Sequence, residues 1–301
     1  MPERTLITGA SGLLGFALAT HLVHRDFDIL GVSRTQSCVG HFPNVRLDLT
    51  QFDKLRDLVH NLRPTVIVHA AALSTVIPCE RSPDEAWLQN YSVTKHLADA
   101  ANHVSAHLVF ISTDQVFDGQ QGLYNETALP RPTNVYGKTK RAAEEALSSI
   151  CKRFLIIRSN NIVGRNFGMG LSFTDKLLEV LLSGRPVTLF TDQIRSPIHL
   201  RECVHAIECC LRNRVEGYIN LGGHEVQSRY ETGLALAQAY NISQDLILPC
   251  TMSSHPDRDF LHRDGSFNTT KLRSLFPSIA GETVVAGFRR DFIADRKLNH
   301  A

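Results

Sequence analysis

The sequence predicts an α/β protein, with a Rossmann-type doubly wound parallel sheet followed by a smaller α+β substrate-binding domain. Short apolar runs alternate with amphipathic helical stretches through the first half of the chain, a pattern typical of parallel sheets covered by helices. A glycine-rich turn follows the first apolar run. Beyond Arg158 the alternation loosens. We therefore predict a dinucleotide-binding domain over residues 1–165, with a contribution from 196–222, and a substrate-capping domain over residues 166–301.

The apolar runs and the turn residues between them place the individual elements. In the first half we expect strands at residues 5–8, 29–32, 45–47, 65–69, 107–112 and 154–158. Helices are expected between them, from the glycine turn to about residue 25, over 50–62, over 83–101, and around residues 136–140. In the second half we expect short strands at 187–190 and 218–221, and helices over 171–183, 200–212, 230–240, 269–275 and 282–295. The segment 192–197 is predicted to be a polar loop.

The glycine turn spans residues 9–15 and lies between a strand and a helix. Glycines there allow a tight turn and a close approach of the backbone to a pyrophosphate, and the helix N-terminus offers N–H groups. The spacing is GxxGxxG, one residue longer in its first step than the GxGxxG dinucleotide fingerprint, so a glycine turn without a ligand is the alternative. The candidate cofactor-binding residues of the turn are Gly9, Ser11, Gly12, Leu13, Leu14 and Gly15.

Further candidate cofactor residues follow the next three strands. Ser33 and Arg34 stand where an NAD site usually has an acid, and a hydroxyl followed by a guanidinium suits a 2′-phosphate, which favours NADP over NAD. A solvated loop arginine is the alternative. Asp48, followed by Leu49, would accept the adenine amino group or cap the next helix. Small residues after the fourth strand let a ligand lie against the backbone, and the remaining candidates are Ala70, Ala71, Ala72 and, in the helix beyond, Asn90.

Tyr136 and Lys140 are the candidate catalytic pair. Four residues apart on a helix, they project from one face. An ammonium nearby favours the phenolate and is expected to lower the phenol pKa from about 10 toward the working range. Thr113, at the end of a predicted strand, offers a hydroxyl that would hold a substrate oxygen beside the phenol. His69 is expected to be structural.

Composition excludes several classes of partner. The formal net charge is +2, which gives no reason to expect binding to nucleic acid or to an anionic membrane surface. We expect no signal peptide, and no apolar run approaches the roughly 18 residues that span a bilayer. The seven cysteines show no CxxC pair, so we expect reduced thiols in a cytoplasmic protein. No His, Cys or carboxylate cluster has metal-ligand spacing.

Four motifs in order resemble the extended short-chain dehydrogenase/reductase superfamily. They are Thr8–Gly15, His69–Ala72, Ser112–Asp114 and Tyr136–Lys140. Within the superfamily, the chain most resembles the dTDP-4-dehydrorhamnose reductase family. The stretches that carry this narrower resemblance are Ser112–Gly119, Pro132–Lys138 and Asp192–Pro197.

The resemblance implies NAD(P)H-dependent reduction of a 4-keto nucleotide sugar, in dTDP-rhamnose biosynthesis. It implies that Tyr136 is the proton donor, that Lys140 lowers its pKa and holds the nicotinamide ribose, and that Thr113 binds the keto oxygen. Members of the family can dimerise with help from a divalent ion. A homodimer is therefore open for this chain, although no residue here matches the metal-binding role.

The chain departs from the family pattern on the substrate side. The family has tyrosine where Gln115 stands and glycine where Arg195 stands. Shortly after the arginine of the sixth strand the family has tryptophan, whereas this chain has Asn161 in that region. We expect an altered substrate pocket built from Thr113, Asp114, Gln115, Asn161 and Arg195.

Two alternative functions stay open. An epimerase of the same superfamily acts on similar nucleotide sugars. A 4,6-dehydratase is disfavoured, because that pattern has Asp-Glu after the threonine and the Gln115 amide exchanges no proton at useful pH. The second alternative is a non-catalytic NADP-binding regulatory protein, since the regulatory β subunit of methionine adenosyltransferase is similar to this reductase family.

Overall fold

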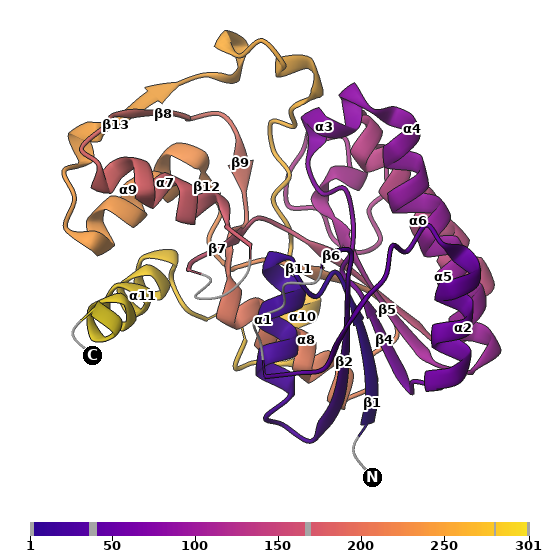
Figure 1. Cartoon of the computed structure of the whole chain (residues 1–301). Helices are drawn as coiled ribbons and strands as arrows, with labels where there is room; N and C mark the ends of the chain where they lie inside the picture. Colours follow the sequence, from indigo (N-terminus) through magenta and orange to yellow (C-terminus); the bar gives the residue numbers. More distant parts are fainter. Residues whose placement is uncertain (1–2, 36–40, 166–169, 280, 300–301) are drawn as a thin grey trace.

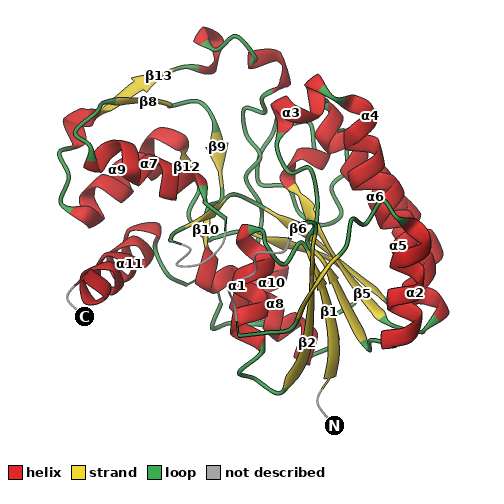
Figure 2. Cartoon of the chain, viewed as in Figure 1, coloured by secondary structure: helices red, strands yellow, loops and turns green. Residues whose placement is uncertain are grey.

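A seven-stranded parallel sheet forms the centre of the molecule (Figures 1 and 2). The computed structural model describes residues 3–35, 41–165, 170–279 and 281–299. The strands of this sheet are β1 (Glu3–Thr8), β2 (Phe27–Ser33), β3 (Asn44–Arg46), β4 (Val66–His69), β5 (His107–Thr113), β6 (Phe154–Ser159) and β11 (Gly217–Leu221). Their order is β11-β6-β5-β4-β1-β2-β3, and the predicted fold class is confirmed.

The strand order reverses beside β1. The chain first winds outward from β1 through β2 to β3, and then crosses back to place β4 on the other side of β1. Thr8 at the carboxyl end of β1 lies between Val32 of β2 and His69 of β4. Ligands of doubly wound sheets bind outside the carboxyl ends of the strands at such a reversal. The glycine turn and the residues after β4 meet at this point.

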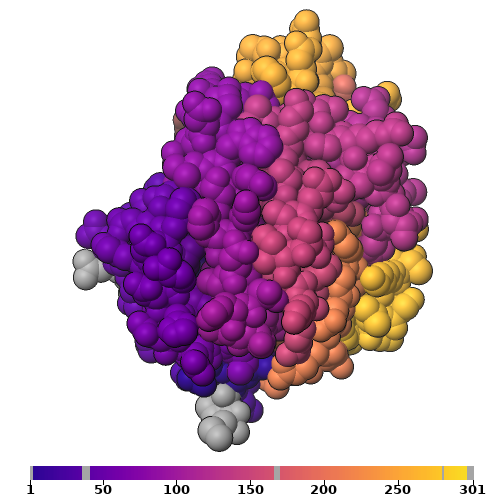
Figure 3. All heavy atoms as spheres, turned by 90° about the vertical axis from the view of Figure 1, so that its right-hand side faces the viewer, coloured from indigo at the N-terminus to yellow at the C-terminus, as the bar shows by residue number. Residues whose placement is uncertain are grey.

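Helices cover both faces of the sheet. One face packs against α1 (Leu13–Leu22), α8 (Leu200–Arg212) and α10 (Thr270–Leu275). The opposite face packs against α2 (Phe52–Leu62), α5 (Val93–His103) and α6 (Val135–Ile150). Successive side chains of a strand point to opposite faces, so Leu6 belongs to one apolar core and Ile7 to the other. Figure 3 views the molecule from the side of α2, α5 and α6, whose atoms cover the sheet there.

A second lobe lies beyond the carboxyl edge of the sheet (Figure 1). Its own apolar core includes Leu178, Leu236 and Phe288. The elements of this lobe and of the short strand pairs beside it are β7 (Ile162–Val163), α7 (Phe173–Leu182), β8 (Val187–Phe190), β9 (Ile194–Arg195), β10 (Ile198–His199), β12 (Gln227–Ser228), α9 (Arg229–Tyr240), β13 (Ile247–Cys250) and α11 (Val284–Asn299). β13 pairs with β8, β10 with β7, and β12 with β9.

The structure differs from the expected elements in a few places. The helix expected over 83–101 is interrupted: α4 (Pro83–Ala86) leads into a π-helical turn (Trp87–Ser92) before α5 begins. The helix α3 (Val76–Arg81) was not predicted. The expected polar loop 192–197 contains β9, because a two-residue strand has too little pattern to be recognised in a sequence. The predicted domain limits stay a prediction.

The described cysteines are all free thiols, and Cys38 lies outside the described residues. Across the part of the chain that the structure describes, no helix is long and apolar enough to cross a bilayer.

Candidate functional site

The N-terminus of α6 places Tyr136 beside the end of β5. Asn134 caps the helix, its side-chain oxygen accepting from the Gly137 N–H at 2.8 Å. A Cβ atom on Gly137 would lie 2.0 Å from the carbonyl oxygen of Gln115, so the absence of a side chain lets the helix approach the turn after β5. This approach brings the Tyr136 phenol beside the Thr113 side chain, whose hydroxyl donates to Asp114 at 3.0 Å.

The environment of Tyr136 keeps the phenol protonated. Burial raises its pKa above the ordinary value, and the neighbouring Thr113 side chain opposes this rise only in part. The expected lowering by Lys140 is not found. Instead the Lys140 ammonium donates to the Ile111 carbonyl oxygen at 2.6 Å and lies 3.8 Å from the centre of the Phe110 ring. Tyr136 is therefore a neutral phenol near neutral pH, which is the form that donates a proton.

Lys140 is completely enclosed. Burial lowers its pKa to about 7, while the Glu144 carboxylate on the next helical turn acts in the opposite direction. Glu144 itself is fixed by a buried two-point ion pair with Arg158, at 3.0 Å to Nε and 2.8 Å to Nη2, and by the Ser112 hydroxyl at 2.6 Å. This group joins α6 to β5 and β6, so the helix that carries the candidate proton donor is held against the sheet.

The glycine turn forms a cradle of closely packed backbone. Gly9 has φ +72°, and a Cβ there would lie 2.7 Å from the backbone nitrogen of Ala71. A Cβ on Gly15 would lie 2.2 Å from the Gly9 carbonyl oxygen. Gly12 precedes α1 and provides no side-chain cap. The turn lies at the strand-order reversal, with Ser11, Leu13 and Leu14 in the turn and Ala70–Ala72 opposite, and Gly170 packs against Gly12 and Leu13. These residues fit the diphosphate of a dinucleotide.

The candidate cofactor residues near the ends of β2 and β3 differ in their exposure to solvent. Ser33 is buried, donates to the Thr35 carbonyl oxygen at 2.5 Å and accepts from Asn44 at 2.9 Å. Arg34 is exposed at the end of β2. Asp48 accepts from the backbone and the hydroxyl of Thr50, and these bonds lower its pKa. The neighbouring Leu49 is buried in the core. Of this group, Arg34 presents its charge to solvent.

Asn90 and His69 are tied into the protein. The Asn90 oxygen accepts from the Leu73 N–H at 2.8 Å, and its nitrogen donates to Thr139 of α6 at 3.1 Å. These bonds give Asn90 a supporting role behind Tyr136, and its contact with a cofactor stays a prediction. His69 is bonded through both ring nitrogens, to the Thr8 hydroxyl at 2.7 Å and the Thr94 hydroxyl at 3.0 Å. Burial lowers the His69 pKa to about 3, so the ring is neutral and structural, as expected.

Four of the five predicted substrate residues form one buried network, in which the Thr113 hydroxyl donates to Asp114 at 3.0 Å. Asp114 accepts from Arg195 Nε at 3.0 Å and from the Gln115 amide at 2.9 Å. The Gln115 oxygen in turn accepts from Asn134 at 3.0 Å. The structure therefore joins Gln115 and Arg195, two of the three positions at which the chain leaves the family pattern. Asn161 stands apart from this network and faces Arg229, whose nitrogen donates to it at 3.4 Å.

Sequence reasoning missed His262 and Gly265. His262 is buried, its ring nitrogen lies 2.9 Å from the Thr133 hydroxyl, and its carbonyl oxygen accepts from Arg195. A Cβ on Gly265 would lie 2.5 Å from an Asp114 oxygen. This segment follows a 3₁₀ turn (Arg258–Phe260) in a region without a recognisable motif. Only the density of polar residues between His262 and Ser266 hinted at a role.

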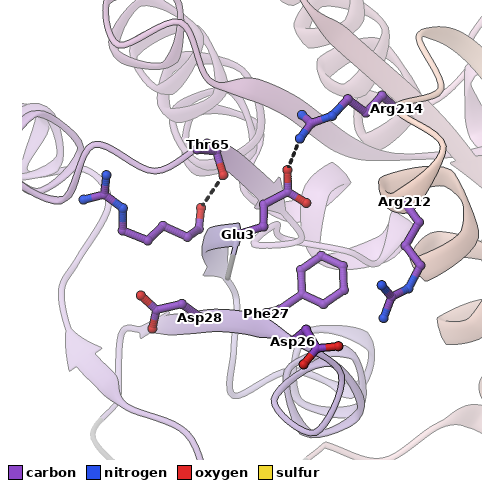
Figure 4. A pocket seen from close by; sticks show the side chains of 8 residues that line it. Glu3, Asp26, Phe27, Asp28, Thr65, Arg212 and Arg214 are labelled. Atoms are coloured by element: carbon purple, nitrogen blue, oxygen red, sulfur yellow. Dashed lines mark hydrogen bonds and ion pairs between the residues drawn. The ribbon is translucent and has the colours of Figure 1, made fainter. Parts of the chain in front are cut away.

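Two surface pockets lie away from this site. The larger, of about 670 Å³, lies at the amino ends of β1 and β2, and the lining side chains include three arginines and three carboxylates (Figure 4). Arg214 pairs with Glu3 there at 2.6 Å. The second, of about 410 Å³, lies where α8 meets the segment before α11. Neither is lined by a predicted site residue. Within the described residues, no group of three potential metal ligands occurs.

Residues 3–280 match the protein family described as the RmlD substrate binding domain. The chain belongs to this family. It is a member of the extended short-chain dehydrogenase/reductase superfamily and is most like the dTDP-4-dehydrorhamnose reductases, as the sequence motifs indicated. The match extends well beyond Pro197, where the last of the named motifs ends.

Solved structures and relatives agree on the family while differing in role. The NADP complex of dTDP-4-dehydrorhamnose reductase from Bacillus anthracis is 26% identical, with a TM-score of 0.88, covering 98% of this chain and 100% of that chain. A hypothetical dTDP-4-dehydrorhamnose reductase from Sulfolobus tokodaii is 32% identical, with a TM-score of 0.82 and coverage of 93% and 97%. Methionine adenosyltransferase 2 subunit beta from Xenopus laevis is 30% identical over 256 residues, which are 83% of this chain and 75% of that protein.

Proposed function

We propose that the protein is an NAD(P)H-dependent reductase of a 4-keto nucleotide sugar, with Tyr136 as the proton donor. One observation carries the proposal: a buried, neutral tyrosine lies beside Thr113 at the carboxyl edge of the sheet that also holds the glycine cradle. A reductase needs a protonated acid at this position, because negative charge grows on the carbonyl oxygen as the carbonyl carbon is reduced.

The proposed cofactor is NADP(H), which supplies the hydride. Gly9, Gly12 and Gly15 would hold its diphosphate, and Arg34 would meet the 2′-phosphate that distinguishes NADP from NAD. The solved reductase from Bacillus anthracis is in complex with NADP, which supports a nicotinamide cofactor here. The preference for NADPH rests on Arg34, which is exposed at the end of β2.

The residues around the substrate carbonyl divide the work. The Thr113 hydroxyl would hold the keto oxygen, and Tyr136 would give its proton to that oxygen as charge develops. The phenolate left behind needs a cation, and Lys140, on the same helix face one turn away, would supply it. Asp114, Gln115 and Arg195 would shape the sugar site, with their side chains already fixed by mutual hydrogen bonds. We propose a cytoplasmic location for this activity.

A second candidate function has a specific observation in its favour. Methionine adenosyltransferase 2 subunit beta proteins are as similar to this chain as the solved reductases are, at 30% identity for the Xenopus laevis protein. Under this reading the chain would bind NADP(H) and a partner enzyme without turnover. The complete set of Thr113, Tyr136 and Lys140 is the reason for proposing the reductase first. Solved UDP-glucose 4-epimerases that are less than 25% identical to this chain share its fold, and their similarity gives no support to an epimerase function.

The test is a screen of purified protein with NADPH against 4-keto sugars linked to dTDP, UDP and GDP. We expect NADPH to be consumed with at least one of these sugars and not in their absence. NADPH binding without consumption for any keto sugar, together with co-purification of a methionine adenosyltransferase, would instead support the second candidate.

A further inference from the structure

A buried ion pair lies beside the candidate catalytic residues. Asp114 directly follows Thr113 in the chain, and Asp114 and Arg195 are each 5% exposed. The Arg195 Nε donates to Asp114 Oδ2 at 3.0 Å, and the Gln115 amide donates to the same oxygen at 2.9 Å. A carboxylate removed from water to this extent depends on such donors, because a buried charge without compensation is strongly unfavourable.

Both donors are residues at which the chain departs from the family pattern. That pattern has glycine at the position of Arg195, and glycine has no side chain that could reach Asp114. The segment that carries Gly265 closes over the pair: a Cβ atom on Gly265 would lie 2.5 Å from Asp114 Oδ2 and 3.4 Å from Arg195 Nε. The compensation of Asp114 by a guanidinium therefore belongs to the altered side of the site.

The second oxygen of Asp114 engages Thr113. The Thr113 hydroxyl donates to Asp114 Oδ1 at 3.0 Å, and the Thr113 oxygen accepts from the Gln115 backbone N–H at 3.2 Å. A hydroxyl has one proton to donate. Thr113 can therefore donate to a keto oxygen only when its proton leaves Asp114. A carboxylate with its full charge holds that proton firmly, whereas one shared with a guanidinium and an amide holds it less firmly.

The charge of Asp114 also acts on Tyr136. Burial raises the Tyr136 pKa most, and the negative charge of Asp114 raises this pKa further. In the proposed reaction, negative charge would grow on the keto oxygen and then remain on the Tyr136 phenolate. A bare carboxylate next to Thr113 opposes both steps, while a carboxylate paired with Arg195 exerts a much weaker repulsion.

We propose that Arg195 is a positioning residue of the reduction: it compensates the charge of Asp114, which releases the Thr113 hydroxyl to the keto oxygen and removes a repulsive charge from beside Tyr136. The proposal rests on the proposed reductase function. Arg195 acts through Asp114 rather than through a contact of its own with the substrate. Gln115 assists as the second donor to Asp114.

The test is a double-mutant cycle on the full chain, with NADPH and the keto sugar found in the screen. Arg195→Gln removes the cation, Asp114→Asn removes the carboxylate that it compensates, and the double variant removes both. Arg195→Lys retains the charge without the planar fork. Arg273→Gln, which removes an exposed arginine of α10, is the matched control. Steady-state kinetics and thermal unfolding are measured for every variant.

We expect Arg195→Gln to lower kcat about 10- to 100-fold and to change KM less than about threefold, because the uncompensated carboxylate opposes the transition state. In the double variant kcat should lie within about threefold of Asp114→Asn alone, since no carboxylate remains to be compensated. Arg195→Lys should lose less than Arg195→Gln, and Arg273→Gln should behave like the wild type.

Two kinetic results would overturn the proposal. A raised KM with unchanged kcat in Arg195→Gln would mean that Arg195 binds the substrate directly. Losses from Arg195→Gln and Asp114→Asn that multiply in the double variant would mean that the two side chains act independently. If Arg195→Gln does not fold alone, folding of the double variant is itself a rescue, and its kcat is then compared with that of Asp114→Asn.

Thermal unfolding separates this proposal from the function on which it rests. Arg195→Gln should lower the unfolding midpoint by about 5–10 °C, and Asp114→Asn in the same chain should restore most of this loss. A restored midpoint in a protein that reduces no keto sugar would leave the charge compensation standing and remove the reductase. Reduction of a keto sugar without rescue in either measurement would keep the reductase and remove the proposed role of Arg195.

Discussion

At the scale of residues, two buried titratable side chains, Tyr136 and Lys140, lie one helical turn apart, and burial shifts their pKa values in opposite directions. Burial raises the pKa of Tyr136 and lowers the pKa of Lys140 to about 7, so the neutral form of each is favoured. In the proposed reaction, proton transfer from Tyr136 would create a phenolate, and that phenolate would favour the protonated form of Lys140. The spacing of the pair was readable from the sequence. The direction of the Tyr136 shift was not, because it depends on how deeply α6 is buried.

The Lys140 shift predicts a pH dependence of stability. Because the pKa is about 7 in the folded protein and about 10.4 in the unfolded chain, the unfolded chain binds the extra proton between these values. Below about pH 7 Lys140 is protonated in both states and burial of its charge costs stability. The free energy of unfolding therefore rises as the pH increases from about 7. We expect urea unfolding of the wild type to gain about 2 kcal/mol between pH 7 and 9 relative to Lys140→Met. Parallel pH profiles for the two proteins would contradict the assigned shift.

Arg34 gives the second prediction at this scale. If Arg34 binds the 2′-phosphate, Arg34→Ala should weaken NADPH binding about 10- to 100-fold and NADH binding by less than about twofold, because only NADPH carries the 2′-phosphate. Fluorescence titration with each nucleotide measures both constants. Equal losses for the two nucleotides would remove the NADP assignment.

At the scale of elements, the position of α6 decides whether the site forms. The helix and its Tyr136–Lys140 face were predictable from spacing alone. The position of the helix against the sheet was not predictable. It depends on the contact between Gly137 and Gln115, which are more than twenty positions apart, and no local pattern indicates such a contact. The interrupted helix before α5 was hidden for a similar reason, since Asn90 bonds to the distant Thr139.

Gly137→Ala tests whether close packing at this point fixes the position of α6. The added Cβ would lie 2.0 Å from the Gln115 carbonyl oxygen, so the helix must move away from the turn that holds Thr113. We expect a loss of about 1–3 kcal/mol in urea unfolding and a marked fall in turnover. Gly281→Ala is the matched control, because its Cβ would meet nothing within 4 Å. If Gly137→Ala behaves like Gly281→Ala, close packing at this point does not position Tyr136.

At the scale of the whole molecule, a sheet and a second lobe meet around one edge. The sheet and the glycine turn were predictable, because strands, turns and helices each leave local patterns. The packing of His262 and Gly265 near Asp114 was not predictable. It joins segments that are far apart in the sequence, and neither residue belongs to a recognisable motif. The substrate side depends on this return, which explains why the sequence located the altered positions without showing how they pack.

The most direct measurement compares NADPH consumption by the wild type and by Tyr136→Phe with a 4-keto nucleotide sugar found in the screen. Phenylalanine keeps the ring and removes the proton. We predict that kcat falls about 10²- to 10⁴-fold while the NADPH dissociation constant changes less than about threefold. Unchanged turnover in Tyr136→Phe would contradict the assignment of Tyr136 as the acid.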